Sequence, residues 1–355
     1  MALKLGINLG YWGIGPKGDE AVELVRAAEA KGYDSVWVAE SYGSDVVSVL
    51  GWLAAQTEKI KLGAAIMQVP ARPPAAAAMA GATLDMLSGG RFIFGFGPSG
   101  PQVSEGLYGV DYAKPWGRTR EYIEVVRKII AREGPVEHKG THYRLPIEGG
   151  TGQGKALKLN FHPLRNEIPV FVGAIGRKSV EMAAEMCDGW IPIFFSADAF
   201  EETWGEHLEA GFAKGGRNRE DLEVSPSLQV AIDGDTEAAR AVVRAGLLLY
   251  IGGMGSRKTN FYVDLTHRFG FGEVADEVQA LYLDGKREEA YNAIPDELVD
   301  ATALVGTEEE VGARIDKLAA AGVDRLILSP VHLDPAQRAH TIERVAALAG
   351  VATPA

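Results

Sequence analysis

The chain has 355 residues, of which 46% are hydrophobic, and its formal net charge is −12 at neutral pH. A chain of this length can bury a large core, as two ordinary domains or as one α/β barrel. The negative charge argues against nonspecific binding to nucleic acid and against docking on anionic lipid, and no apolar run is long enough to span a membrane.

The cysteine content and the amino-terminal segment indicate the cellular compartment. The single cysteine, Cys187, rules out an internal disulfide and suits a reducing cytoplasm. Its apolar surroundings predict a thiol packed in the core rather than a nucleophile. The amino-terminal segment is broken by glycines and soon becomes acidic, which is typical of a first strand and loop and not of a signal peptide. We therefore expect a cytoplasmic protein.

Helices and strands alternate along most of the chain. The segments AAEAKGYDSVWVA, AAEMCDGWIPIFF and LAAAGVDRLILSP each contain a helix, a Gly or Asp-Gly turn and then a strand, a pattern that indicates crossover connections and a parallel sheet. Strands are predicted near Leu5–Leu9, Ser35–Val38, Ile60–Ala65, Phe92–Phe96, Val170–Val172, Trp190–Phe194, Val224–Ala231 and Arg325–Leu328. Eight strands predict an α/β fold of the (β/α)8 TIM-barrel type, as a single domain over residues 1–355.

The segment LGAAIMQVPARPP, residues 62–74, runs from the third predicted strand to an alanine-rich helix. Residues just past the carboxyl end of a barrel strand face the binding crevice. This position makes candidate cofactor contacts of Ala65, Ile66, Met67 and Gln68. The local pattern indicates a place for a cofactor and does not identify a reaction.

Three glycines after the fourth strand match a dinucleotide-binding pattern. In FGFGPSGP, Gly95, Gly97 and Gly100 have the G-x-G-x-x-G spacing. However, Pro98 and Pro101 remove backbone N–H groups that a phosphate cradle would use, and the strand is the fourth rather than the first. A Rossmann-type site is therefore disfavoured.

Two stretches interrupt the repeat of strands and helices. Residues 134–167 are rich in Gly, Pro and His, and residues 247–300 look helical after a glycine-rich loop. We expect both to be insertions that cover the C-terminal face of the barrel, where the active sites of this fold lie. In the first, His138 and His142 are four apart without a helix to align them, so no metal site is predicted. In the second, GGMGSRKT resembles a phosphate loop, but Arg257 replaces its second glycine, which argues against a nucleotide-triphosphatase. For the basic pair Arg257 and Lys258 we favour a solvated surface.

The segment GAIGRKS, residues 173–179, follows the fifth predicted strand and opens a helix. Free N–H groups and the helix dipole at such a terminus can hold a phosphate. The alternative is an ordinary strand-to-helix turn with a solvated Arg177. We favour the phosphate site because the segment lies on the catalytic face.

Together these segments resemble the bacterial luciferase-like superfamily, in the branch of oxidoreductases that use the deazaflavin coenzyme F420. The resemblance covers nearly the whole chain. The matching pieces are SVWVAESYGSD, LGAAIMQVPARPP, GRFIFGFGPSGPQVSEGLYG, GRTREYIEVVRKI, KLNFHPLRNEIPVFVGAIGRKSVEMAAEMCDGWIP and LVGTEEEVGARIDKLAAAGVDRLIL.

The resemblance implies where the cofactor would lie. A bulge in the third strand, with a non-prolyl cis peptide behind the isoalloxazine-like ring, would fall at Ala65–Ile66. Residues along the ribityl chain and the ring would be Ser99, Gly100 and Gln102. The phosphate would be held by Gly173, Ala174, Ile175, Gly176 and Arg177. We also expect Trp12 to reach the mouth of the pocket.

The acid–base candidates follow two of the strands. Many deazaflavin dehydrogenases of this family carry an Asp-His pair after the second strand, where this chain has Glu40 and Ser41. Glu40 can accept or deliver a proton or hydrogen-bond the ring, but Ser41 lacks the imidazole that titrates near neutrality. His332, just past the last strand, is the other candidate, with a surface or core histidine as the alternative.

The resemblance implies an enzyme that transfers a hydride between coenzyme F420 and an organic substrate held above the ring by the insertions. One alternative is a monooxygenase that uses flavin mononucleotide (FMN) on the same fold. Another, suggested by the missing histidine, is a deazaflavin- or flavin-binding protein without catalysis. We expect a homodimer with a small-molecule substrate, and no metal, membrane or nucleic acid as a partner.

Overall fold

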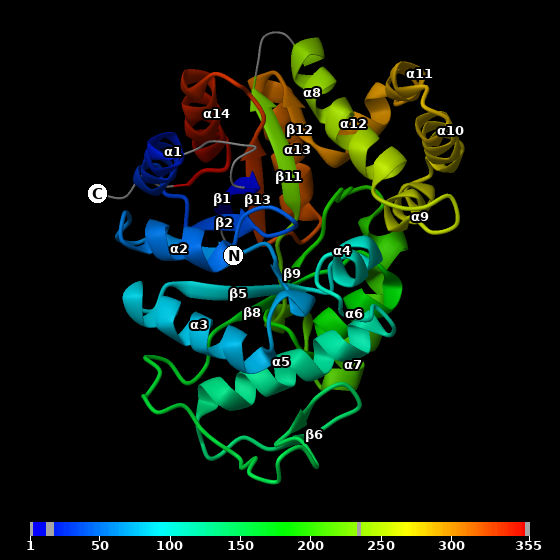
Figure 1. The fold of residues 1–355 in the computed structure, drawn as a ribbon. Helices are drawn as coiled ribbons and strands as arrows, with labels where there is room; N and C mark the ends of the chain where they lie inside the picture. The colour runs from blue at the N-terminus through cyan, green and yellow to red at the C-terminus, as the bar shows by residue number, and fades with distance from the viewer. Residues whose placement is uncertain (1–2, 12–17, 233–235, 352–355) are drawn as a thin grey trace.

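A curled parallel sheet lies at the centre of the molecule and is surrounded by helices (Figure 1). The computed structural model describes residues 3–11, 18–232 and 236–351, and Trp12 lies outside them. The strands are β1 (Lys4–Tyr11), β2 (Ser35–Ala39), β3 (Lys61–Ala64), β4 (Met67–Gln68), β5 (Phe92–Gly97), β6 (His138–Lys139), β7 (Arg144–Leu145), β8 (Val170–Gly173), β9 (Gly189–Ile191), β10 (Glu223–Val224), β11 (Ser227–Ile232), β12 (Leu304–Gly306) and β13 (Arg325–Pro330). The main sheet has the order β10-β9-β8-β5-β3-β2-β1-β13-β11-β12, and β4 pairs with β5.

The sheet closes into a barrel at residues 223–232. There β10 pairs with β9 and β11 pairs with β13, so one segment has neighbours on both sides, and a further bridge joins Ile193 to Ser227. Pro226 has no N–H to donate, and it divides the single strand predicted at Val224–Ala231 into two. The (β/α)8 barrel predicted from the sequence is confirmed, with its strands in the expected order.

Helices lie on the outside of the barrel and, in the second insertion, beyond the carboxyl ends of its strands. They are α1 (Asp19–Ala30), α2 (Val46–Ala54), α3 (Pro74–Leu87), α4 (Pro101–Gly106), α5 (Pro115–Ala131), α6 (Arg177–Met186), α7 (Glu206–Gly215), α8 (Thr236–Leu248), α9 (Phe261–Arg268), α10 (Gly272–Leu283), α11 (Arg287–Asn292), α12 (Asp296–Thr302), α13 (Glu308–Ala320) and α14 (Pro335–Leu348). In α1 the buried side chains include Ala21, Leu24 and Ala28, which lie on one face because of their helical spacing. Within the described ranges, no helix is long and apolar enough to cross a membrane.

Large side chains fill the interior of the barrel. Trp37 of β2 and Phe171 of β8 are buried there, with ring centroids 5.4 Å apart. Glycines on neighbouring strands make room for these rings, because a Cβ at Gly63 would lie 2.3 Å from Trp37 and a Cβ at Gly189 would lie 2.3 Å from Phe171. The barrel is therefore a packed core without a channel, and a ligand site must lie at one of its ends.

The first insertion does not cover the C-terminal face, which corrects the expectation for residues 134–167. The hairpin of β6 and β7 packs along α5, where the Glu121 carboxylate accepts backbone N–H groups of the hairpin turn at 2.8–3.0 Å. Further on, Arg165 binds the Asp85 carboxylate and the carbonyl of Phe92, the first residue of β5. The physical reason lies in these contacts: Glu121 holds the hairpin against α5, and Arg165 fastens the end of the segment to the amino end of β5, opposite the catalytic face.

The second insertion does lie at the C-terminal face, and residues 247–300 are helical as predicted. Tyr250, in a π-helical turn after α8, and Tyr262 of α9 contact the ring of Phe194 with centroid distances of 5.1 and 5.8 Å. Phe194 follows β9, so these tyrosines lie beyond the carboxyl ends of the strands. The short strand β12 was not predicted, and it extends the sheet beside β11 at the end of this insertion.

Candidate active site

The bulge in the third strand lies between β3 and β4, and the Ala65–Ile66 peptide is cis, as the resemblance predicts. The bulge is fastened to the end of β2. The Ala65 N–H donates to the Val38 carbonyl at 2.8 Å, and the Glu40 N–H donates to the Ile66 carbonyl at 3.3 Å. These bonds hold the bulge at the carboxyl edge of the barrel.

The side chain of Ile66 fits between two glycines of neighbouring strands. A Cβ at Gly97 would lie 2.4 Å from Ile66 Cδ1, and a Cβ at Gly173 would lie 3.0 Å from Ile66 Cγ2. A Cβ at Gly95 would lie 1.7 Å from the Ala64 carbonyl oxygen. The glycines of the G-x-G pattern therefore allow the bulge to approach β5 closely, and they also bring it beside the Gly173 loop.

The predicted contacts in the turn after β5 lie at the same edge. Ser99 has a positive φ of 65°, and the Tyr112 hydroxyl donates to its carbonyl at 2.9 Å. Gly100 is the N-cap of α4, and Gln102 is an exposed residue of its first turn. Burial raises the pKa of Tyr112 to about 12, so its hydroxyl stays protonated at neutral pH. The cofactor contacts assigned to this turn remain a prediction.

Glu40 is buried at the end of β2, with 6% of its surface exposed, and its carboxylate is fully engaged. Arg72 donates to Oε2 at 3.0 Å and to Oε1 at 2.5 Å, a bidentate ion pair. Oε2 also accepts the Gln68 N–H at 2.9 Å, and the Gln68 side-chain amide donates to the Glu40 carbonyl at 3.1 Å. The same carboxylate thus fixes both the cation and the strand that follows the bulge.

Arg72 also contacts a second carboxylate, that of Asp45, at 2.8 Å. Burial alone would lower the pKa of Arg72, but the hydrogen bond and charge of Glu40 and the charge of Asp45 raise it above its ordinary value. Both oxygens of the Glu40 carboxylate are thus occupied by hydrogen bonds that hold Arg72 and Gln68 in place. The acid–base role of Glu40 remains a prediction, and positioning of the bulge is a competing role. Arg72 lies in the segment LGAAIMQVPARPP, but nothing in the sequence singles it out within that segment.

The predicted phosphate loop, Gly173–Arg177, connects β8 to α6. Indole N–H groups hold its carbonyls: Trp190 Nε1 donates to Ala174 at 2.8 Å, and Trp204 Nε1 donates to Ile175 at 3.1 Å. The N–H of a trans peptide points opposite to its carbonyl, so the N–H groups of Ile175 and Gly176 face away from the indoles. Among the described residues, no side chain caps the N-terminus of α6. The loop therefore offers backbone donors for an anion.

A cavity of about 620 Å³ lies beside this loop and is lined by Arg177 and by Arg268, the last residue of α9. Arg268 Nη2 donates to the Ile175 carbonyl at 2.9 Å. Burial lowers the pKa of Arg268, and the positive charge of Arg177, which lines the same cavity, lowers it further. Arg268 was not predicted, because it lies in the second insertion, far from the loop in sequence.

His332 follows the carboxyl end of β13. Its Nδ1 is 3.3 Å from the Thr341 hydroxyl in the middle of α14, and its backbone carbonyl accepts a hydrogen bond from Arg338 at 2.9 Å. The imidazole therefore packs against a helix on the outside of the barrel. Its role as an acid or base remains a prediction.

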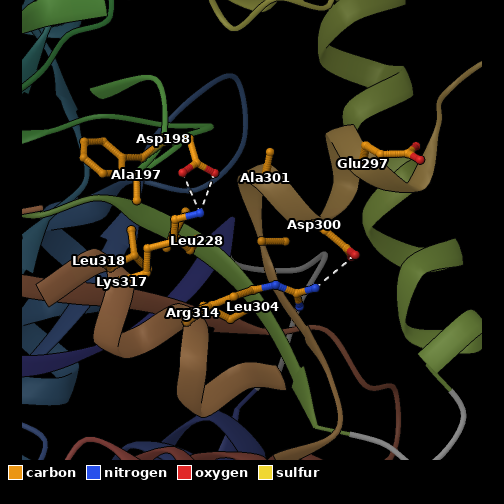
Figure 2. Close-up of a pocket in the computed structure, with 12 residues that line it drawn as sticks. Ala197, Asp198, Leu228, Glu297, Asp300, Ala301, Leu304, Arg314, Lys317 and Leu318 are labelled. Atoms are coloured by element: carbon orange, nitrogen blue, oxygen red, sulfur yellow. Dashed lines mark hydrogen bonds and ion pairs between the residues drawn. The ribbon is translucent and has the colours of Figure 1, made fainter. Parts of the chain in front are cut away.

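A second cavity, of about 250 Å³, lies between the segment after β9 and the helices α12 and α13 (Figure 2). Ion pairs border it, with Lys317 and Asp198 2.5 Å apart and Arg314 and Asp300 3.0 Å apart. Its apolar lining includes Leu304 of β12. Because these charged groups already neutralise one another, the cavity is a weaker candidate for an ionic ligand than the cavity at Arg177.

Neither thiol nor metal chemistry is indicated by the described residues. Cys187 is fully buried, and burial raises its pKa to about 12, so the thiol is protonated, as expected for a residue of the core. Within the described part of the chain, no group of three or more His, Cys, Asp or Glu side chains is arranged to hold a metal ion.

The fold and the bulge define a class of protein. The family model described as luciferase-like monooxygenase matches residues 8–325, and the chain belongs to this family.

Named relatives extend this assignment. The chain is 49% identical over 331 residues to a Mycobacterium tuberculosis protein named "Putative coenzyme F420-dependent oxidoreductase Rv3520c", an alignment that covers 92% of this chain and 95% of the relative. It is 30% identical to 5,10-methylenetetrahydromethanopterin reductase of Archaeoglobus fulgidus, over 87% of this chain and 89% of that one. The structure of coenzyme F420-dependent tetrahydromethanopterin reductase from Methanopyrus kandleri superposes with a TM-score of 0.77, at 26% identity and over 98% of both chains.

Proposed function

We propose that the protein is an oxidoreductase that binds coenzyme F420 and transfers a hydride between this cofactor and a small organic substrate. The observation that carries the proposal is the meeting of the Ala65–Ile66 bulge with the Gly173–Arg177 loop at one edge of the barrel. The two features would receive the two ends of one cofactor, a flat ring and a phosphate. The names of the relatives support coenzyme F420 as that cofactor.

The residues present fit such a cofactor. Ile66 packs against Gly97 and Gly173 and forms a smooth apolar support for a ring. The N–H groups of the Gly173–Arg177 loop and the uncapped N-terminus of α6 suit a phosphate. Ser99 and Gln102 follow β5, which lies between β3 and β8 in the sheet. They would therefore contact the ribityl chain that joins the ring to the phosphate.

When bound, the deazaflavin supplies a ring carbon that donates or accepts the hydride. The protein's own tasks are to orient the ring, to exclude water and to manage one proton. The ion pair of Glu40 and Arg72 would hold the bulge behind the ring. Above the edge, Tyr250 and Tyr262 would exclude water, and burial raises the pKa of both phenols, so they stay neutral and protonated.

A monooxygenase that uses FMN is the second candidate, because the matching family model is described as luciferase-like monooxygenase and the loop would accept an FMN phosphate as well. A binding protein without catalysis is the third. Titration of the protein with each cofactor, followed by fluorescence quenching, separates the first two, and we expect tighter binding of coenzyme F420. Equal or tighter binding of FMN, with oxidation of the reduced flavin by dioxygen, would favour the monooxygenase. Binding without turnover of any substrate would favour the third.

We also propose that the protein is a cytoplasmic homodimer. Exposed apolar side chains on α3, Met79, Met86 and Leu87, would suit a subunit interface. Light scattering coupled to gel filtration measures the mass directly, and a monomer at micromolar concentration would exclude the dimer.

A further inference from the structure

We propose that Arg268, supplied by the second insertion, is the second cation of an oxyanion site at the N-terminus of α6, where it binds the phosphate of the cofactor together with Arg177. The identity of the cofactor rests on the proposed function, whereas the site itself requires only a phosphate group. Nothing in the barrel repeat assigns a ligand to the insertion, so this role is separate from that of the Gly173–Arg177 loop.

One terminal nitrogen of the Arg268 guanidinium has a hydrogen-bond acceptor in the described residues, and the other does not. Nη2 donates to the Ile175 carbonyl of the loop at 2.9 Å. Nη1 is buried and has no hydrogen-bond partner among the described residues. A buried donor on a charged group is costly to leave unsatisfied, so an acceptor is expected beside Nη1.

Thr203 gives an independent indication of a ligand. This residue is only 4% exposed and lines the same cavity as Arg177 and Arg268. Its Oγ1 is buried and finds no hydrogen-bond partner within the described part of the chain. Unsatisfied donors on two different elements, a π-helical turn before α7 and the end of α9, therefore border one cavity next to the uncapped α6 terminus. A phosphate has enough acceptor oxygens for all of them.

Two like charges lie in the lining of the cavity. Arg177 is exposed and Arg268 is half-buried. An anion between their guanidinium groups would offset the repulsion of the two positive charges. Carboxylates line the cavity as well, at Asp198, Glu202 and Glu297. Asp198 is already paired with Lys317 at 2.5 Å. The anion is therefore expected at the end of the cavity formed by α6 and α9.

The test compares cofactors with and without a phosphate on the full-length protein. Dissociation constants are measured by fluorescence quenching for coenzyme F420 and for its riboflavin-like deazaflavin core without phosphate, and in parallel for FMN and riboflavin. The variants are Arg268→Gln, Arg268→Lys and Thr203→Val. The matched control is Arg257→Gln, which changes an exposed arginine of the same insertion that pairs with Asp284 at 2.9 Å.

We expect Arg268→Gln to weaken binding of the phosphorylated cofactor roughly tenfold to hundredfold, and to leave binding of the compound without phosphate within about twofold. Arg268→Lys should retain part of the affinity, since it keeps the charge but loses the planar fork. Thr203→Val should weaken binding of the phosphorylated cofactor less than Arg268→Gln does. Arg257→Gln should change the dissociation constant of neither the phosphorylated nor the unphosphorylated compound. An equal loss for both kinds of compound, or no loss at all, would overturn the proposal.

A phosphate probe separates this proposal from the proposed function. If the wild-type protein binds neither coenzyme F420 nor FMN, the proposed function is wrong. Inorganic phosphate, compared with chloride at equal ionic strength, should then still raise the unfolding temperature of the wild type and of Arg257→Gln more than that of Arg268→Gln. If phosphate stabilises the wild type and Arg268→Gln equally, or stabilises neither, the oxyanion site is rejected.

Discussion

Two charged corners at the carboxyl edge of the barrel are built in opposite ways. In the Glu40 corner, formed by Glu40, Arg72 and Asp45, the arginine lies 2.5 and 2.8 Å from carboxylates on both sides. In the Arg177 corner, formed by Arg177 and Arg268, two like charges line the same cavity. Charges that neutralise one another make a support, whereas like charges around one cavity make a place for a ligand of opposite sign.

Removal of the cation from the Glu40 corner should have the largest effect. Arg72→Met leaves the buried Glu40 carboxylate without its ion pair, and breaking a buried pair in this way costs about 3–5 kcal/mol. We expect this loss in the free energy of unfolding measured with urea, together with weak cofactor binding. Arg257→Met, which breaks an exposed pair, should cost less than about 1 kcal/mol. Similar losses of unfolding free energy in the two variants would show that the Glu40 corner does not stabilise the fold more than an exposed ion pair does.

Removal of a cation from the Arg177 corner should affect binding instead of folding. Arg177 is exposed, so Arg177→Ala should leave the free energy of unfolding nearly unchanged. Loss of a charge-assisted hydrogen bond, worth about 1.5–3 kcal/mol, should weaken cofactor binding roughly tenfold to hundredfold. Fluorescence titration and urea unfolding of the same sample check both parts. An unchanged dissociation constant would mean that the loop is only structural.

Glu40→Gln distinguishes support from proton transfer. The ion pair favours support, so we expect stability to fall by about 1–3 kcal/mol and cofactor affinity and rate to fall together. If Glu40 instead supplies or relays the proton, affinity should stay within a few-fold while the single-turnover rate drops by ~10²–10⁴. If Glu40→Gln keeps the single-turnover rate of the wild type, the acid must be His332 or water.

The smallest effect is expected at Asp45, at the rim of the same corner. Burial alone would raise the pKa of Asp45, but hydrogen bonds from Ser48 and the charge of Arg72 lower it below the ordinary value of 3.8. A lowered pKa stabilises the folded protein above pH 3.8, and this contribution is lost as the pH falls further. Asp45→Asn keeps the cap on α2, so it should lower the free energy of unfolding by less than about 1 kcal/mol. The free energy of unfolding of this variant should also fall less steeply than that of the wild type as the pH drops below 3.8. An unchanged acid profile would contradict this account.

The sequence was sufficient for the barrel because each strand–helix unit carries its own signal. The spacing of Ala21, Leu24 and Ala28 predicts the buried face of α1 without knowledge of the rest of the chain. The three-residue strand β12 has no such signal, since its place beside β11 depends on tertiary contacts. The position of residues 134–167 was missed for a different reason, because composition alone does not show which end of the barrel a loop occupies.

The parts of the site that come directly after a strand were predicted. The parts that depend on contacts between residues distant in sequence were missed. Ile66 and the Gly173 loop come directly after strands, so their place at the carboxyl edge follows from the fold. Arg72 and Arg268 contact Glu40 and Ile175 across distances of chain that no local pattern spans. Such partners become visible only when the strands and the insertion are brought together in space.

The packing inside the barrel restricts how this family can vary. Trp37 occupies the space that a side chain at residue 63 would need, and Phe171 does the same for residue 189. Gly63→Ala alone should therefore disrupt the packing of the interior. The same substitution should destabilise the protein much less when a smaller residue replaces Trp37. Among related proteins we expect these positions to vary in pairs, a large ring on one strand accompanied by glycine on its neighbour.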